Sequence, residues 1–150
     1  MSAQFDALQG HRMSDSEIDQ FLSEQGTGVL SMTADGVPYG LPLSVGYAGG
    51  DRLYFLFAGH SEEGRKVTYA ERSETVSFLV YDVDADRGWQ SVMIEGSLER
   101  ITVDDWETAR EAMADNAFRP DLLTDVDDWE DPRVWALDIE ERSGRTNTTN

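Results

Sequence analysis

The sequence contains no cysteine and only one lysine, Lys66, among its 150 residues. The absence of cysteine excludes disulfides, zinc–cysteine sites, iron–sulfur clusters and thiol catalysis. Basic side chains are also scarce: 12 lysines and arginines stand against 30 aspartates and glutamates, which gives a net charge of −18. Nucleic acids and anionic membrane surfaces repel a polyanion, so neither is expected as a partner.

Long apolar runs are missing as well. No run approaches the roughly 18 residues that a membrane-spanning helix needs, and the first residues lack the basic-then-apolar pattern of a secretion signal. We therefore expect a soluble, cytoplasmic protein. Its length fits a single domain over residues 1–150, and its 39% of hydrophobic residues, with 10% aromatic residues, are enough for a packed core.

The acidic residues are spread from Asp6 to Glu141 and do not form a tail. Such a charge repels itself in dilute buffer, whereas molar salt shortens the Debye length to about 3 Å and removes most of that cost. We interpret the pattern as that of a protein from a high-salt cytoplasm. The alternative is an ordinary acidic protein.

The first half of the chain predicts a helix followed by a hairpin. Residues 1–13 show no strong period and are expected as an N-terminal extension. Ser14 and Glu17 form a capping box for a helix that Gly26 ends. Alternating residues then predict strands over 27–34 and 37–47, joined by an Asp-Gly turn. Pro38 and Pro42 place the second strand at an edge or over bulges.

The second half predicts four more strands, over 52–58, 74–82, 89–101 and 133–139. Between them we expect a polar loop over 59–65 with a helix to Arg72, an acidic loop from Asp82 to Gly88, and a helix capped by Thr102. An acidic connector over 117–132 precedes the last strand, and a frayed tail over 142–150 follows it.

This order predicts a mainly β (α+β) fold: a small antiparallel barrel, Greek-key-like or split, of about six strands with flanking helices. The core of the fold is expected over residues 14–101, and residues 102–141 add the second helix, the connector and the final strand. The candidate core residues are Val29, Leu30, Leu53, Phe55, Val76, Phe78, Val80, Val92, Ile94 and Leu98.

Two kinds of site are poorly supported. His11 and His60 lie near no nucleophile motif and lack the spacing of metal ligands, so neither a serine triad nor a metal site is expected. The segment Asp82 to Asp86 is similar to a calcium loop only at its start, because Gly88 is out of register and the closing acidic ligand is missing. A solvated acidic loop is the better interpretation.

The segment from His60 to Lys66 is the best candidate site. It has a hydroxyl at Ser61, and it ends in Arg65 and Lys66 where a helix starts. A hydroxyl, free helical amides and paired cations suit a phosphate group. The alternative is a surface helix whose cations only form ion pairs with Glu62 and Glu63. A lone lysine in an otherwise lysine-free chain favours the anion site.

The order of these elements resembles a known family. A capped helix is followed by a GVLSM strand, a DG turn, and the segments PYGLPLSVGY, RLYFLFA, HSEEGRKVTYAERSETVSFLV and WQSVMIEGSLERI. This order is similar to that of the pyridoxamine-5′-phosphate-oxidase-like family of FMN-binding split β-barrels, across about residues 14–101. The resemblance implies an FMN-binding homodimer that holds the flavin in a cleft between two barrels.

The resemblance also implies roles for particular residues. Arg65 and Lys66 would hold the FMN phosphate, with Ser61 near it. The flavin ring would be lined by backbone groups of two strands and reached by the start of a third. These residues are Leu41, Pro42, Leu43 and Ser44, then Tyr54, Phe55 and Leu56, and finally Trp89, Gln90 and Ser91. A glutamine is expected in the last group, yet Ser91 occupies its register and Gln90 lies one residue away.

The expected activity follows from the same resemblance. His60 matches a histidine near the flavin in the nitroimidazole-reductase-like branch, and the resemblance makes it a candidate catalytic residue; the alternative is an exposed loop imidazole. The chain lacks the C-terminal Trp and Arg segment with which true pyridoxamine-phosphate oxidases bind their product. We therefore expect an FMN-dependent oxidoreductase of an unassigned small molecule. The alternatives are a flavin-storage protein and a deazaflavin or haem in the same cleft.

Overall fold

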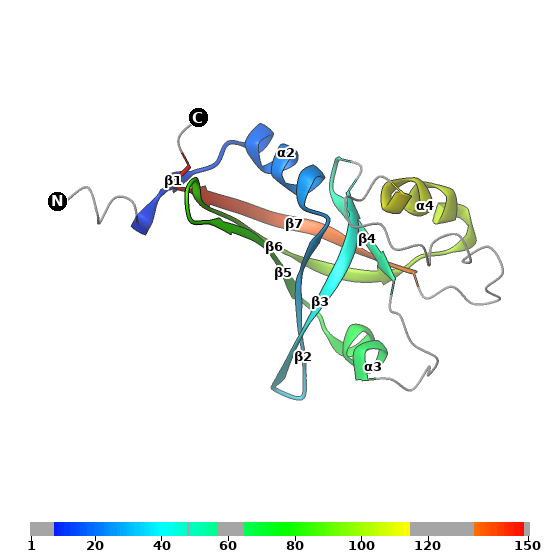
Figure 1. The fold of residues 1–150 in the computed structure, drawn as a ribbon. Coiled ribbons are helices and arrows are strands. Elements are labelled where there is room, and N and C mark those ends of the chain that lie inside the picture. The colour runs from blue at the N-terminus through cyan, green and yellow to red at the C-terminus, as the bar shows by residue number, and fades with distance from the viewer. Residues whose placement is uncertain (1–7, 48, 57–64, 115–133, 149–150) are drawn as a thin grey trace.

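The computed structural model describes residues 8–47, 49–56, 65–114 and 134–148, which form strands and helices around a curved sheet (Figure 1). The elements in chain order are β1 (His11–Arg12), α2 (Asp15–Gln25), β2 (Thr27–Ala34), β3 (Val37–Tyr47), β4 (Arg52–Leu56), α3 (Arg65–Arg72), β5 (Val76–Asp84), β6 (Gly88–Arg100), the 3₁₀ helix η1 (Val103–Asp105), α4 (Trp106–Ala114) and β7 (Val134–Thr146). No helix in this part of the chain has the length and apolar character needed to cross a membrane.

The sheet closes on itself. Its strand order is β1-β7-β4-β3-β2-β5-β6, and β6 also pairs with β7, so that β2 to β7 form a ring of antiparallel strands. Two seams of the ring are short, because β2 pairs with β5 only over Val29–Ser31 and β3 pairs with β4 only over Val45–Tyr47. The predicted split barrel of about six strands is confirmed, and β1 adds a short strand beside β7.

Local sequence signals fix several boundaries. The Ser14 hydroxyl accepts a hydrogen bond from the Glu17 amide at 3.2 Å, and the Glu17 carboxylate accepts one from the Ser14 amide at 3.0 Å. Gly26 ends α2 in the left-handed conformation with a φ of 67°. Asp35 and Gly36 both have positive φ, as the tight turn between β2 and β3 requires. The predicted bounds of α2, β2 and β3 are confirmed.

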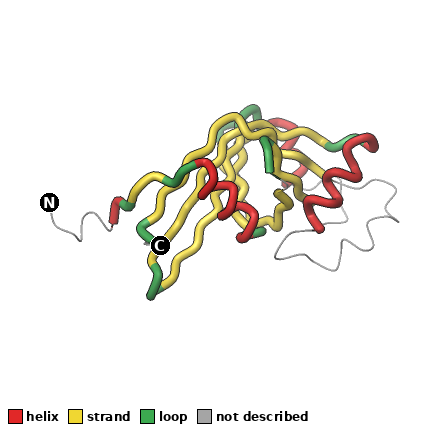
Figure 2. Tube along the Cα trace, turned by 90° about the horizontal axis from the view of Figure 1, so that it is seen from above, coloured by secondary structure: helices red, strands yellow, loops and turns green. Residues whose placement is uncertain are grey.

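The core fills the barrel interior, and residues of two helices join it. Eight of the ten candidate core residues are buried, while Val29 and Leu98 are partly exposed. Ile18, Phe21 and Leu22 of α2 join this core, as does Ala70 of α3. A second cluster lies between α4 and the outer side of β4 and β7, where Ala109 and Met113 pack with Tyr54 and Ala136. Figure 2 shows the helices arranged around the curved sheet.

Two predicted boundaries were wrong. The final strand continues to Thr146, so residues 142–146 are not frayed but pair with β6. The acidic loop is shorter than predicted, because Asp82, Val83 and Asp84 belong to β5 and only residues 85–87 form the turn. At the end of β7 the inward positions hold a glycine and polar residues, so the sequence lacks the apolar alternation that marks a strand. At the end of β5 Tyr81 and Val83 alternate with Asp82 and Asp84, but these apolar side chains are exposed. The predicted end of the third strand at 57–58, and the predicted polar loop over 59–65 except for Arg65, lie outside the described residues. The predicted connector over 117–132 lies wholly outside them.

Candidate functional site

One edge of β3 is open over residues 37–44. Among the described residues this segment pairs only with β2. Successive residues of an antiparallel strand direct their backbone groups to opposite edges. The Val45 amide donates to the Gly26 carbonyl on the β2 side at 2.9 Å, so the even-numbered residues of this segment direct their backbone groups to the open edge.

Both prolines of β3 fall on this open edge. Pro38 and Pro42 lack an N–H group and are tolerated only where no ladder bond is required, which confirms that the strand has edge character. The amides of Gly40 and Ser44 are the donors left at this edge. A ligand lying along residues 41–44 would therefore meet one backbone donor, at Ser44, and the carbonyl of Pro42, because the pairing of Val45 with Phe55 turns the Ser44 carbonyl toward the Leu56 amide.

The side chains of this strand divide between the two faces of the sheet. Leu41 and Leu43 pack against the barrel core. Pro42, Ser44 and Gly46 face outward, where α4 covers Gly46 so closely that an added Cβ would lie 2.5 Å from the Ala112 backbone. Pro42 and Ser44 are the members of the predicted group that present their side chains outside the barrel.

Helix α3 is fastened to the β2–β3 hairpin. The Ser73 hydroxyl donates to the Thr33 carbonyl at 2.9 Å and accepts from the Thr33 amide at 3.1 Å. The rings of Tyr69 and Tyr39 lie 5.1 Å apart. These contacts fix the position of the helix beside the open strand.

The start of α3 has an unusual charge for this chain. The helix begins with Arg65 and Lys66 and has no acidic residue in its first turn, whereas α2 has Asp15 and Glu17 in that position. The first turn of a helix directs its backbone amides toward the N-terminus, and two cations add to that positive end, which favours an anion there. The side chains of Arg65 and Lys66 lie outside what the structure describes, and His60 and Ser61 lie outside it entirely.

The predicted residues Tyr54 and Phe55 of β4 present neither ring nor free backbone to a ligand. Tyr54 is buried beneath α4, and Phe55 is fully buried in the barrel core. Their backbone lies in the ladders that β4 forms with β3 on one side and β7 on the other. Leu56 ends β4, and its side chain is not among those described.

The start of β6 splits the last predicted group between two faces. Gln90 points toward α2, where it lines a groove of about 360 Å³ with Phe21 and Arg87. Trp89 and Ser91 lie on the opposite face by strand alternation. The Trp89 carbonyl accepts bonds from the Asn147 amide and the Thr146 hydroxyl, both at 3.1 Å. Of Gln90 and Ser91, Ser91 is the residue that shares an outward face with Pro42 and Ser44.

The start of β6 lies far from the hairpin position that holds the C-terminal end of α3. Val29, Leu79 and Met93 form one cross-strand row. Trp89 lies four residues from this row in one direction, and Thr33, which binds the end of α3, lies four residues from it in the other. At about 3.3 Å per residue this separates them by roughly 26 Å along the strands. The outer face of a barrel is also convex, so one chain does not enclose a ligand between these groups.

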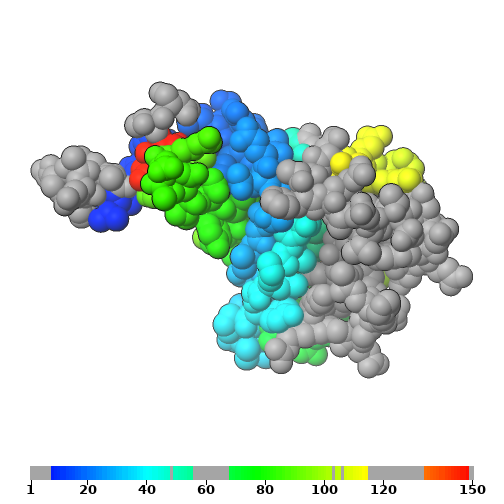
Figure 3. Space-filling view, viewed as in Figure 1, coloured from blue at the N-terminus to red at the C-terminus, as the bar shows by residue number. Residues whose placement is uncertain are grey.

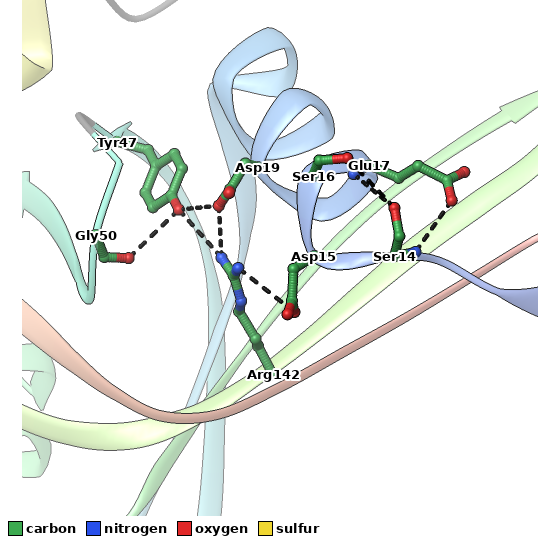
Figure 4. A network of polar contacts seen from close by, with 8 residues as sticks. All are labelled: Ser14, Asp15, Ser16, Glu17, Asp19, Tyr47, Gly50 and Arg142. Atoms are coloured by element: carbon green, nitrogen blue, oxygen red, sulfur yellow. Dashed lines mark hydrogen bonds and ion pairs between the residues drawn. The ribbon is translucent and has the colours of Figure 1, made fainter.

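Sequence reasoning missed a polar cluster around Asp19, Tyr47 and Arg142 (Figure 4). The Asp19 carboxylate accepts hydrogen bonds from the Tyr47 hydroxyl at 2.5 Å and from Arg142 at 2.7 Å. The bond from Arg142, and then that from Tyr47, lowers the pKa of Asp19, while burial and the Asp19 carboxylate raise the pKa of Tyr47. The cluster joins α2, β3 and β7, and its members are too far apart in sequence to form a recognisable motif.

The family model of pyridoxamine 5′-phosphate oxidase matches residues 14–146, which span from the cap of α2 to the end of β7. The chain belongs to this family. No curated protein matches the chain.

Solved structures of similar fold agree with this family assignment. An FAD-binding protein from Mesorhizobium loti is 25% identical, with a TM-score of 0.71 over 91% of this chain and 96% of that one. A putative 5-nitroimidazole antibiotic resistance protein from Bacteroides thetaiotaomicron is 16% identical, with a TM-score of 0.70 over 91% and 86%. An FAD-binding protein from Mycobacterium smegmatis is 18% identical, with a TM-score of 0.69 over 92% and 98%.

The match to the pyridoxamine 5′-phosphate oxidase family spans the elements from α2 to β7. The ligand site of this chain is therefore sought among these elements. The described part of the chain contains no group of three histidine, aspartate or glutamate side chains arranged to hold a metal ion. The features that remain for a ligand are the open edge of β3, the cationic start of α3 and the outward residues of β6.

Proposed function

We propose that this protein is an FMN-dependent oxidoreductase of a small molecule, with the flavin held between two copies of the chain. The observation that carries the proposal is the family match over residues 14–146. The flavin supplies hydride exchange at its ring, and the protein orients the partner molecule against it.

The residues of this chain suit a phosphorylated flavin. Arg65 and Lys66 stand at a helix start without an acidic neighbour in the first turn, which favours a phosphate. The open edge of β3 provides the Ser44 amide and the Pro42 carbonyl, a donor and an acceptor for the polar edge of a flavin ring. The side chains of Pro42 and Ser44 are small enough to let a flat ring approach the strand.

A second copy is part of this proposal because one chain leaves the site open. The outward residues Pro42, Ser44 and Ser91 lie on a convex surface, and Trp89 is about 26 Å along the strands from the end of α3. A second barrel against this surface would convert it into a cleft. His60 keeps its proposed position near the flavin.

The phosphate site is tested by two variants and a matched control. Arg65→Ala and Lys66→Ala should each weaken flavin retention by about 1–3 kcal/mol, because a charge-assisted hydrogen bond is lost. Arg87→Ala removes a cation from the β5–β6 turn and should have little effect. Retention is measured by equilibrium dialysis against FMN in molar KCl, and equal losses in all three variants would show that bulk charge governs binding.

The identity of the flavin needs its own experiment. The Mesorhizobium loti neighbour is described as an FAD-binding protein, so FAD is the second candidate. Flavin released from the purified protein by heat and separated by chromatography will distinguish FMN from FAD. A colourless protein that takes up neither, but binds a reduced deazaflavin or haem, would replace the proposal by that alternative.

Catalysis is separated from storage by electron transfer. The flavin-loaded protein is mixed anaerobically with NADH, NADPH, reduced deazaflavin or nitroaromatic acceptors, and the flavin absorbance is followed. An oxidoreductase should exchange electrons with one of these faster than free FMN does. If none reacts faster, the protein stores or presents flavin.

A further inference from the structure

The tip of the β2–β3 hairpin stands apart from the rest of the sheet. The pairing of β2 with β5 ends at Ser31, and residues 37–43 of β3 pair only with β2. Among the described residues, the tip over residues 32–39 therefore has no third strand on either side. In Figure 3 the tip (cyan) reaches the lower edge of the molecular surface. An element other than a strand has to hold it in place.

Ser73, the residue that follows α3, takes the place of the missing strand beside β2. The Gly26 carbonyl accepts from the Val45 amide on the β3 side, so the even-numbered residues of β2 bond toward β3 and the odd-numbered ones toward β5. Thr33 is the first odd-numbered residue after the pairing with β5 ends. Its carbonyl accepts from the Ser73 hydroxyl at 2.9 Å, and its amide donates to the same oxygen at 3.1 Å. One side chain thus satisfies both backbone groups that β5 leaves without a partner.

Helix α3 needs contacts of this kind to hold its position. It has eight residues, whereas isolated helices shorter than about 12–15 residues are marginal in water. Arg65 and Lys66 stand at its start, where the positive end of the helix dipole is unfavourable for cations. The Ser73 amide continues the helical ladder by donating to the Tyr69 carbonyl at 2.9 Å. The residue that bonds to Thr33 is therefore joined directly to the last turn of the helix.

Further contacts lead from α3 to the same hairpin. The Tyr69 ring lies 5.1 Å from the ring of Tyr39 on β3. Arg72 lies 3.0 Å from Asp35 in the turn, but their side chains are 60% and 82% exposed, so this ion pair contributes little in high salt. The Ser73 bonds reach backbone atoms of β2 and therefore hold the helix more firmly than the ion pair does.

We propose that Ser73 is a positioning residue for the phosphate end of a bound flavin. The inference rests on the proposed function, in which the start of α3 holds the phosphate and the open edge of β3 meets the ring. Both groups then belong to one unit, the hairpin with α3 attached, and the Ser73 bonds set their separation. A ligand that spans two points gains the full affinity of the second only when the spacing is preorganised. Loss of the Ser73 hydroxyl should therefore weaken recognition of the phosphate and spare recognition of the ring.

The test compares FMN with riboflavin, which has the same ring and ribityl chain but no phosphate. Dissociation constants for both are measured by equilibrium dialysis in molar KCl, on the full chain freed of bound flavin. Ser73→Ala should weaken FMN binding about three- to tenfold and riboflavin binding by less than about twofold. Ser73→Thr keeps a hydroxyl at this position and should retain the wild-type ratio of the two constants. Thermal melts show whether each variant is folded.

Ser23→Ala is the matched control. The Ser23 hydroxyl also donates to a backbone carbonyl, that of Asp19 at 2.8 Å, but it belongs to α2, which lies apart from α3 (Figure 1). This variant should leave the ratio of the two constants unchanged.

The inference and the proposed function fail in different ways. If Ser73→Ala weakens both flavins equally or leaves both unchanged, Ser73 has only a structural role and the inference alone is overturned. A wild-type chain that binds FMN no more tightly than riboflavin would also overturn it, because the phosphate would then not be recognised. A wild-type chain that binds neither flavin would refute the proposed function, and the inference with it.

Discussion

The cluster of Asp19, Tyr47 and Arg142 should contribute measurably to stability, and Asp19→Asn is the change that tests it. The carboxylate accepts two short hydrogen bonds, at 2.5 Å from Tyr47 and 2.7 Å from Arg142. Hydrogen bonds to a charged group contribute about 1.5–3 kcal/mol when buried. The Asp19 side chain is 49% exposed, so solvent screens part of this, and asparagine keeps a neutral acceptor. We expect a loss of about 1–1.5 kcal/mol.

The measurement is urea unfolding at constant KCl, with the thermal midpoint as a second readout. For a chain of this size the loss corresponds to a fall in Tm of about 2–6 °C. Asp15→Asn is the matched control, since Asp15 lies 3.6 Å from the same arginine but its side chain is 90% exposed. That variant should change stability by less than about 0.5 kcal/mol.

The pH dependence gives the decisive result. The bonds from Arg142 and Tyr47 lower the pKa of Asp19 in the folded protein. Its contribution is therefore fully present above the unfolded value of about 3.9 and is lost as the pH falls through the lower folded pKa. The difference between wild type and Asp19→Asn should stay constant near neutral pH and shrink in acid. A cost no larger than that of Asp15→Asn, or one that is independent of pH down to acid unfolding, would refute the reasoning.

Three further predictions concern packing, capping and salt. Gly46→Ala should destabilise the protein by about 1–3 kcal/mol because the new Cβ meets the α4 backbone; in urea unfolding Gly40→Ala, whose Cβ would have no neighbour closer than 3.7 Å, should cost clearly less. Ser14→Ala removes the cap of α2 and should cost about 1 kcal/mol, while Ser23→Ala, which removes a bond within the same helix, serves as its comparison. Raising KCl from about 0.1 to 1 M should raise the Tm, because the Debye length falls from about 10 to 3 Å; a Tm that falls steadily with KCl would rule out the high-salt interpretation.

Much of the fold could be predicted because its signals are local. The capping box at Ser14 and the turn at Asp35 and Gly36 each depend on neighbouring residues, so the bounds from α2 to β3 followed directly. The second half of β7 gave no such signal. The position of Gly144 faces inward, where Met13 and Ile18 occupy the space that a side chain would need. Arg142 faces Asp19, which is 123 residues away in the sequence. A glycine and an arginine at inward positions conceal the alternation of a strand.

The candidate site was predictable in its residue types but not in its geometry. The lone lysine and its arginine neighbour marked the start of α3, and both prolines marked an edge of β3. Strand alternation puts Gln90 and Ser91 on opposite faces, but the sequence could not show which of them faces outward, because that is set by the pairing of β6 with β5. It also could not show that the convex surface leaves Ser91 and Ser44 without an enclosing wall.

The closure of the barrel by β7 has a consequence for synthesis of the protein. β4 ends at Leu56, and β7, the strand that pairs with its second edge, begins only at Val134. At roughly 5–20 residues per second, about 4–16 s of translation separate the two. During this time the edge of β4 that β7 later covers has no native partner on the ribosome, and after Arg100 the same holds for the edge of β6. The nascent chain is therefore exposed to wrong strand pairing, and its dense negative charge would help to keep neighbouring nascent chains apart until the barrel closes.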